Sequence, residues 1–150
     1  MMDIAEWIRD EHNQFRALLG VVVRTTNTEL DQRVHSFEKA RRGLHAHATA
    51  EEEVLFIAMQ ENSQTRPAAL EALEWHRSAR RVMKELVDLD PKHELWLPKM
   101  KVVQGVILVH FEIEESDALR SIQKAFEPKR LDQLYTDFRS IEKSVLERRS

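Results

Sequence analysis

Six polar residues interrupt the apolar stripes of four predicted helices, and they are of the types that bind metal ions through nitrogen and oxygen. In the first helix, His12 lies four residues after Ile8 and three before Phe15, where the helical period calls for an apolar residue. The same test gives the set His12, His47, Glu51, His76, His110 and Glu114. An inward histidine taken alone is most simply a hydrogen-bonded core residue. Six such residues at the middle of one bundle predict a shared site.

The two glutamates indicate what that site would hold. Uncompensated carboxylates in a bundle core each cost several kcal/mol, and neutral histidines compensate them poorly, whereas metal cations would cancel their charge. His47 and Glu51 are four residues apart, as are His110 and Glu114, so each pair can reach one point between the helices. Iron and zinc both accept imidazole and carboxylate ligands.

The pattern occurs twice along the chain. The second-half histidines and glutamate follow their first-half counterparts by 63 or 64 residues. A duplicated helix hairpin would bring two half-sites face to face, each with two histidines and one carboxylate. This count predicts two metals bridged by two carboxylates, in a nearly symmetric site with open positions on both metals.

The elements that position these residues are all predicted to be helices. The 150 residues include only three Gly and four Pro, and no segment alternates apolar and polar residues. Turn-like segments divide the chain into helices over about 3–23, 28–60, 67–87, 94–126 and 128–148. Asp3 is the expected N-cap of the first helix and Thr28, with Asp31, that of the second, while Val34 and Leu70 are expected on apolar faces. We predict an all-α fold in one domain: an up-down-up-down four-helix bundle over about 3–126, and an extra C-terminal helix packed across its outside.

Composition excludes several classes of function. The absence of cysteine removes thiolate metal sites and disulfide scaffolds. A net charge of −3 offers no general attraction for nucleic acid. No run approaches the roughly 18 apolar residues of a membrane-spanning helix, and the N-terminus lacks the basic and apolar blocks of a secretory signal. We therefore expect a cytoplasmic protein without nucleic-acid or membrane partners.

Four short motifs carry a resemblance to a known family. They are Asp10-Glu11-His12, the run from His47 to Phe56 (HATAEEEVLF), Glu74-Trp75-His76, and the run from His110 to Glu115 (HFEIEE). In this order and spacing they resemble the hemerythrin-like, or HHE cation-binding, domains, from about residue 3 to 126. The resemblance implies an oxo- and carboxylate-bridged non-haem di-iron centre, in which Glu51 and Glu114 bridge two Fe ions and the four histidines complete the ligand shells. Ferritin-like bundles use Glu-x-x-His instead, and this spacing does not occur here.

One position departs from the oxygen-carrying hemerythrins, which have a fifth histidine four residues after the third-helix histidine. This chain has Arg80 there. The resemblance thus favours sensing or redox roles over oxygen carriage. Among the neighbouring residues, His45 is expected at the surface, Glu52 and Glu115 either in solvent or against the ligands, and Trp7, Trp75 and Trp96 in packing.

The predicted function is that of a di-iron protein that binds or reacts with O₂, NO or peroxide in a sensing or redox, stress-protective role. Whether it is an enzyme stays open at this point; steady turnover with an external electron donor would decide. The alternatives are a reversible oxygen carrier, an iron store or sensor without turnover, and a histidine phosphotransfer module. The last also uses four helices but leaves the repeated glutamates unexplained.

Overall fold

The computed structural model describes residues 2–148, and its regular elements are all helical. In chain order they are α1 (Ile4–Val23), α2 (Leu30–Ala50), the π-helical turn η1 (Glu51–Leu55), α3 (Phe56–Gln60), α4 (Arg66–Val87), α5 (Trp96–Ser116), α6 (Ala118–Ala125) and α7 (Pro128–Arg148). The all-α prediction is confirmed, as are the approximate positions of the five helical segments.

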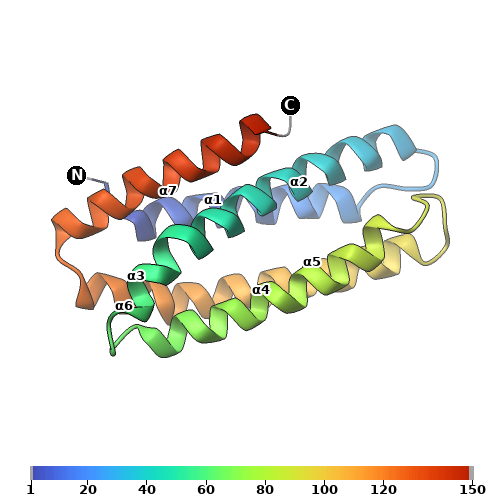
Figure 1. Ribbon diagram of the computed structural model, residues 1–150. Coiled ribbons are helices and arrows are strands. Elements are labelled where there is room, and N and C mark those ends of the chain that lie inside the picture. The colour runs from blue at the N-terminus through green and yellow to red at the C-terminus, as the bar shows by residue number, and fades with distance from the viewer. Residues whose placement is uncertain (1, 149–150) are drawn as a thin grey trace.

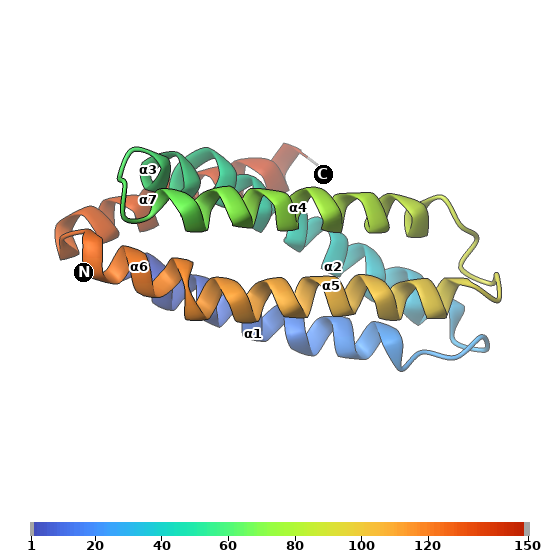
Figure 2. The same ribbon diagram turned by 90° about the horizontal axis from the view of Figure 1, so that it is seen from below.

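The long helices run up and down in sequence, as an antiparallel bundle. Figure 1 shows the α1–α2 and α4–α5 connections at one end, and the α3–α4 and α6–α7 connections at the other. The C-terminal helix α7 lies across α1, α2 and η1, on the side of the bundle away from α4 and α5 (Figures 1 and 2). The predicted bundle with an extra C-terminal helix is therefore the observed architecture.

The start of α1 has the N-cap that the sequence predicts, whereas the start of α2 does not. The Asp3 carboxylate accepts a hydrogen bond from the Ala5 amide at 2.8 Å and caps α1 as expected. The predicted capping pair of Thr28 and Asp31 is wrong, because α2 begins at Leu30 without a side-chain cap. Instead, the Glu29 carboxylate accepts hydrogen bonds from the amide and hydroxyl of Thr26, which fixes the turn before the helix.

Two of the predicted helices are interrupted. The segment predicted as one helix over 28–60 contains the π turn η1, which widens the backbone at Glu51. The segment predicted as one helix over 94–126 breaks at Asp117, between α5 and α6. Both irregularities begin at or just after the candidate glutamates, at equivalent places in the two halves of the chain. Apolar periodicity does not report such local changes of winding.

The apolar core is divided into two clusters by a polar layer at mid-bundle. One cluster is built around Ile8, Phe56 and Phe138, and the other around Leu19, Trp96 and Met100. Burial of each side chain of this size stabilises the fold by about 1.5–3 kcal/mol, so the two clusters fix the helices on either side of the polar layer.

Two residues expected on apolar faces are instead exposed: Val34 at 44% and Leu70 at 42%. Next to Val34, Arg33 is buried. Its guanidinium donates hydrogen bonds to the Thr25 hydroxyl, the Thr25 carbonyl and the Pro91 carbonyl, and lies 5.1 Å from the Trp96 ring centroid. An arginine held by four hydrogen bonds thus takes the inward position next to Val34.

Candidate metal centre

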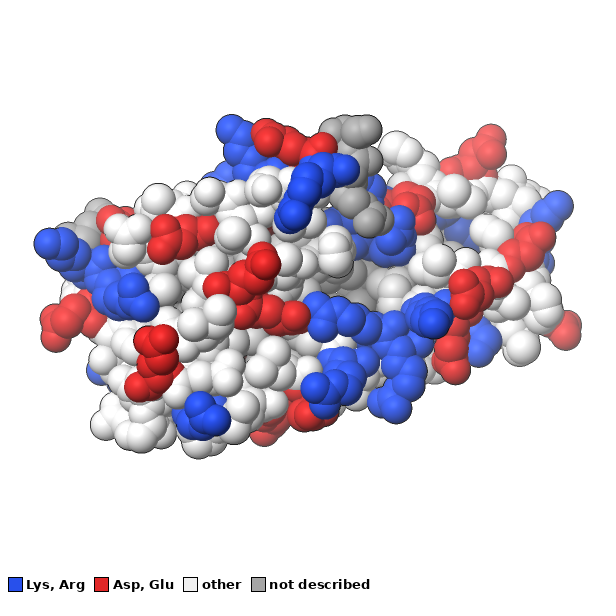
Figure 3. Space-filling model, viewed as in Figure 1, with Lys and Arg blue, Asp and Glu red and all other residues white. Residues whose placement is uncertain are grey.

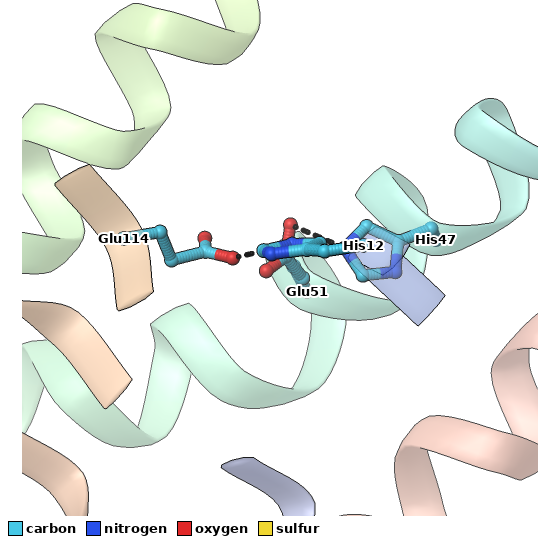
Figure 4. Close-up of side chains that lie close together, drawn as sticks. All are labelled: His12, His47, Glu51 and Glu114. Carbon is cyan, nitrogen blue, oxygen red and sulfur yellow. Dashed lines mark ion pairs between the residues drawn. The ribbon is translucent and has the colours of Figure 1, made fainter. Parts of the chain in front are cut away.

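All six predicted residues lie together in the polar layer between the two apolar clusters. Each is at least 94% buried, and they come from α1 (His12), α2 (His47), η1 (Glu51), α4 (His76) and α5 (His110, Glu114). They form two overlapping groups, one with His12 and His47 and the other with His76 and His110. Glu51 and Glu114 belong to both groups, and Figure 4 shows these two carboxylates pointing toward each other from opposite helices.

The distances within the layer are those of groups that face a common centre. His12 Nε2 lies 3.1 Å from Glu114 Oε1, and His110 Nε2 lies 3.5 Å from Glu114 Oε2. His47 Nε2 and His76 Nε2 lie 3.3 Å and 3.1 Å from the same oxygen, Glu51 Oε1. Each carboxylate therefore approaches histidines from both half-sites.

Many of these buried atoms have no hydrogen-bond partner within residues 2–148. They include all four oxygens of Glu51 and Glu114, Nε2 of His12 and His47, and both ring nitrogens of His110. Leaving a buried polar atom unsatisfied costs about 1–3 kcal/mol, and more when it carries charge. Converging imidazole nitrogens and carboxylate oxygens, unsatisfied by protein, fit metal ions that accept nitrogen and oxygen ligands.

Three of the histidines are oriented by carboxylates on their outer side. The Nδ1 atoms of His12, His47 and His76 lie 2.7, 2.9 and 2.6 Å from carboxylate oxygens of Glu115, Glu11 and Glu52. A carboxylate that accepts the Nδ1 proton fixes the ring and leaves Nε2 as a lone-pair donor toward the centre. Glu52 and Glu115, which sequence placed equally in solvent or near the ligands, thus have positioning contacts.

Comparison with known families decides the assignment. Residues 3–122 match the hemerythrin HHE cation binding domain, which is most of the chain. The chain belongs to the hemerythrin HHE cation-binding family. Searches of curated proteins and of solved structures found no match. The family resemblance predicted from sequence is confirmed, and cation binding is the activity that it supports.

The hemerythrin-like centre is less symmetric than the repeat predicted. In one respect the two halves match: Glu52, which follows Glu51, contacts His76 of α4, and Glu115, which follows Glu114, contacts His12 of α1. The residues that precede His12 and His76 differ. Glu11 contacts His47, whereas its counterpart Trp75 has no carboxylate to offer His110. The Trp75 ring lies over His110 at 6.4 Å between centroids. The expectation of nearly equal half-sites is wrong on this point.

The charges in the hemerythrin-like centre are strongly coupled. Burial alone would raise the pKa of Glu51, but the adjacent His47 and His76 outweigh it and hold that pKa well below its usual range. Burial and the negative charge of Glu51 raise the pKa of Glu114 to about 7. Burial, reinforced by the neighbouring histidines, lowers the pKa of His110 to about 3. Two carboxylates that oppose each other's ionisation would be relieved by a divalent cation between them.

Sequence reasoning missed one buried polar contact beside the centre, which comes from outside the matched family region. Glu142 of α7 is buried next to Glu11 and His47, and its carboxylate accepts a hydrogen bond from Trp7 Nε1 at 3.2 Å. Glu142 follows Phe138 by four residues and precedes Val145 by three, so it interrupts the apolar stripe of α7. The signal that found the other six residues was therefore present here as well.

A pocket opens between α2 and α4 and reaches ligand residues of both half-sites. Glu51, His47, His76 and His110 line it, whereas His12 and Glu114 do not. Arg80 lies in its wall and donates a hydrogen bond to Glu52, which in turn orients His76. His45 is exposed, as predicted, and also lines the pocket. This pocket thus gives solvent access to the centre from the side of His47, His76 and His110.

Proposed function

We propose that this hemerythrin-like domain binds two iron ions and that this di-iron centre reacts with O₂, NO or peroxide in a sensing or redox, stress-protective role. His12 and His47 would hold one iron, His76 and His110 the other, and Glu51 and Glu114 would bridge them. The observation that carries the proposal is the pair of buried ligand groups that share both carboxylates. Bound iron would supply the redox chemistry.

The protein's own residues would orient the histidine ligands, shield the centre from water and offset the charge of the metal ions. The outer carboxylates Glu11, Glu52 and Glu115 hold three imidazole rings with Nε2 inward. Phe111 stacks on His12 at 3.8 Å between centroids, which keeps water from that side. The pocket beside His76 supplies the path for a small ligand.

The position of Arg80 favours reaction over reversible oxygen carriage. A guanidinium stays protonated and has no lone pair for a metal, and here it is directed to Glu52. One iron would therefore have one protein ligand fewer than in the oxygen carriers, and an open position facing the pocket.

Two other functions explain fewer observations. A zinc site would use the same atoms but would supply no redox chemistry. A phosphotransfer histidine must be exposed, whereas all four central histidines are at least 94% buried.

A cytoplasmic location and an external electron donor stay predictions. No helix within residues 2–148 is both long enough and apolar enough to cross a membrane.

Stopped-flow absorption on mixing the reduced protein with O₂ tests the reactive role. We expect prompt conversion to an oxidised spectrum, without a long-lived oxygen adduct, and consumption of peroxide or NO when reductant is present. A stable spectrum that argon reverses would contradict this role and restore oxygen carriage. Reductant-dependent turnover at a steady rate would identify an enzyme, and a single stoichiometric reaction a sensor.

A further inference from the structure

The pocket between α2 and α4 is much larger than a diatomic ligand or peroxide requires. Its volume is about 350 Å³, and the buried side chains of Glu51, His76 and His110 form its inner end. A water molecule occupies about 30 Å³ of liquid, and a cavity of about 150 Å³ encloses benzene. Scaling from benzene gives room for roughly 14 non-hydrogen atoms, within the usual size range of pockets for small organic ligands.

The pocket wall is apolar over most of its depth. The apolar lining comes from α2, α4 and α5 and consists of Leu44, Ala48, Ala79, Met83, Val87, Ile107 and Phe111. Because α4 packs mainly against α3 and α5, space remains between α4 and α2. An unbranched hydrocarbon chain fits such a wall, because each CH₂ moved from water to an apolar surface contributes about 0.8 kcal/mol.

The pocket mouth is cationic. Arg41, Arg80 and Lys84 line it, and Figure 3 shows Lys and Arg side chains gathered around the hollow in this face. Arg41 and Arg80 also contact Glu38 and Glu52, whereas no carboxylate lies within ion-pair distance of Lys84 among the described residues. Arg80 and Lys84 are four residues apart on α4, so their like charges repel across one helical turn. An anion at the mouth would relieve this repulsion.

We propose that this pocket binds an amphipathic monocarboxylate with an unbranched chain of about eight to ten carbons. Its chain lies along Leu44, Met83 and Ile107, and its carboxylate lies at the mouth between Arg80 and Lys84. The inference rests on the proposed function only in placing the inner end of the chain beside the iron-binding residues. The ligand class therefore goes beyond O₂, NO and peroxide, since it joins an acidic head to an apolar body.

Isothermal titration calorimetry of the full-length, metal-loaded protein with octanoate tests the proposal, with octanol and acetate as comparison probes. We expect saturable octanoate binding, octanol binding about tenfold weaker, and no measurable acetate binding. Lys84→Gln should weaken octanoate binding about tenfold and leave octanol binding unchanged. The matched control is Arg81→Gln, an exposed cation of the same helix outside the pocket lining, which should change neither.

Three results would overturn the proposal: absence of octanoate binding, equal binding of octanoate and octanol, or octanoate binding insensitive to Lys84→Gln. If octanoate binding is lost on metal removal but unchanged by Lys84→Gln, the carboxylate binds the metal, and the proposed orientation is wrong. The iron content of the same samples separates the two proposals. Two bound irons without octanoate binding refute only the ligand class. Octanoate binding by protein that takes up no iron on reconstitution refutes only the proposed function.

Discussion

Replacing Glu142 with glutamine should make the stability of the protein less sensitive to pH. Burial, together with hydrogen bonding to Glu11 and the charge of Glu11, raises the pKa of Glu142 to about 8. Burial alone would also raise the pKa of Glu11, but His47 and Glu142 outweigh it and lower that pKa. Near neutral pH, Glu142 is therefore the protonated member of the pair. Glutamine has the shape of the protonated Glu142 side chain and can likewise donate a hydrogen bond to Glu11.

The sign and size of the effect follow from the two pKa values of Glu142. The folded protein holds this proton up to about pH 8, whereas the ordinary carboxyl pKa is 4.5. Folding stability is thus lost as pH rises from about 4.5 to 8, because the unfolded chain releases the proton first. Full conversion of the difference gives about 5 kcal/mol. Solvent at the edge of the cluster and the nearby Arg139 reduce this to roughly 2 kcal/mol.

Urea unfolding at pH 5, 7 and 9, followed by circular dichroism at fixed metal content, measures this effect. Glu142→Gln should exceed the wild-type free energy of unfolding by less than about 1 kcal/mol at pH 5 and by about 2 kcal/mol at pH 9, because the unfolded wild-type chain has begun to release its proton at pH 5. The exposed Glu85→Gln on α4 is the control and should show no pH-dependent difference. A Glu142→Gln difference that is the same at pH 5 and pH 9, or a more stable wild type at pH 9, would refute the reasoning.

Two further pairs of variants test the site and the packing around it. Glu51→Ala should lose most of the bound metal and about 3–5 kcal/mol of stability, because it strands buried partners, whereas His45→Ala should retain both; metal analysis and urea unfolding would show whether this holds. Gly105→Ala should stabilise α5 by about 1 kcal/mol, since no atom of a neighbouring element lies within 4 Å of the new methyl group. Gly43→Ala should lack that gain, because its methyl group would lie 2.9 Å from the Phe15 ring; thermal unfolding in which both variants gain equally would contradict this.

The sequence predicted the helices and the central cluster because both follow from one periodicity. Apolar residues at spacings of three and four mark an inward face, and a histidine or glutamate on that face is inward too. His12 and Glu114 are both at least 98% buried, as this reasoning requires. Whether these residues bind metal stays a prediction.

The features that sequence did not predict depend on contacts between helices. The π turn at Glu51 and the break at Asp117 are changes of backbone winding that residue periodicity does not report. The unequal surroundings of His47 and His110 depend on which residue of another helix faces each outer ring nitrogen. Glu142 could have been found from the stripe of α7, but its partner Glu11 could be identified only once α1 and α7 were placed together.

Metal analysis combined with Mössbauer spectroscopy, on protein purified from iron-replete cells, tests the central claim most directly. The two ligand groups that share Glu51 and Glu114 predict two irons per chain, with the spectrum of a magnetically coupled pair. Protein that carries only zinc, or at most one metal after anaerobic reconstitution with iron, would contradict the claim.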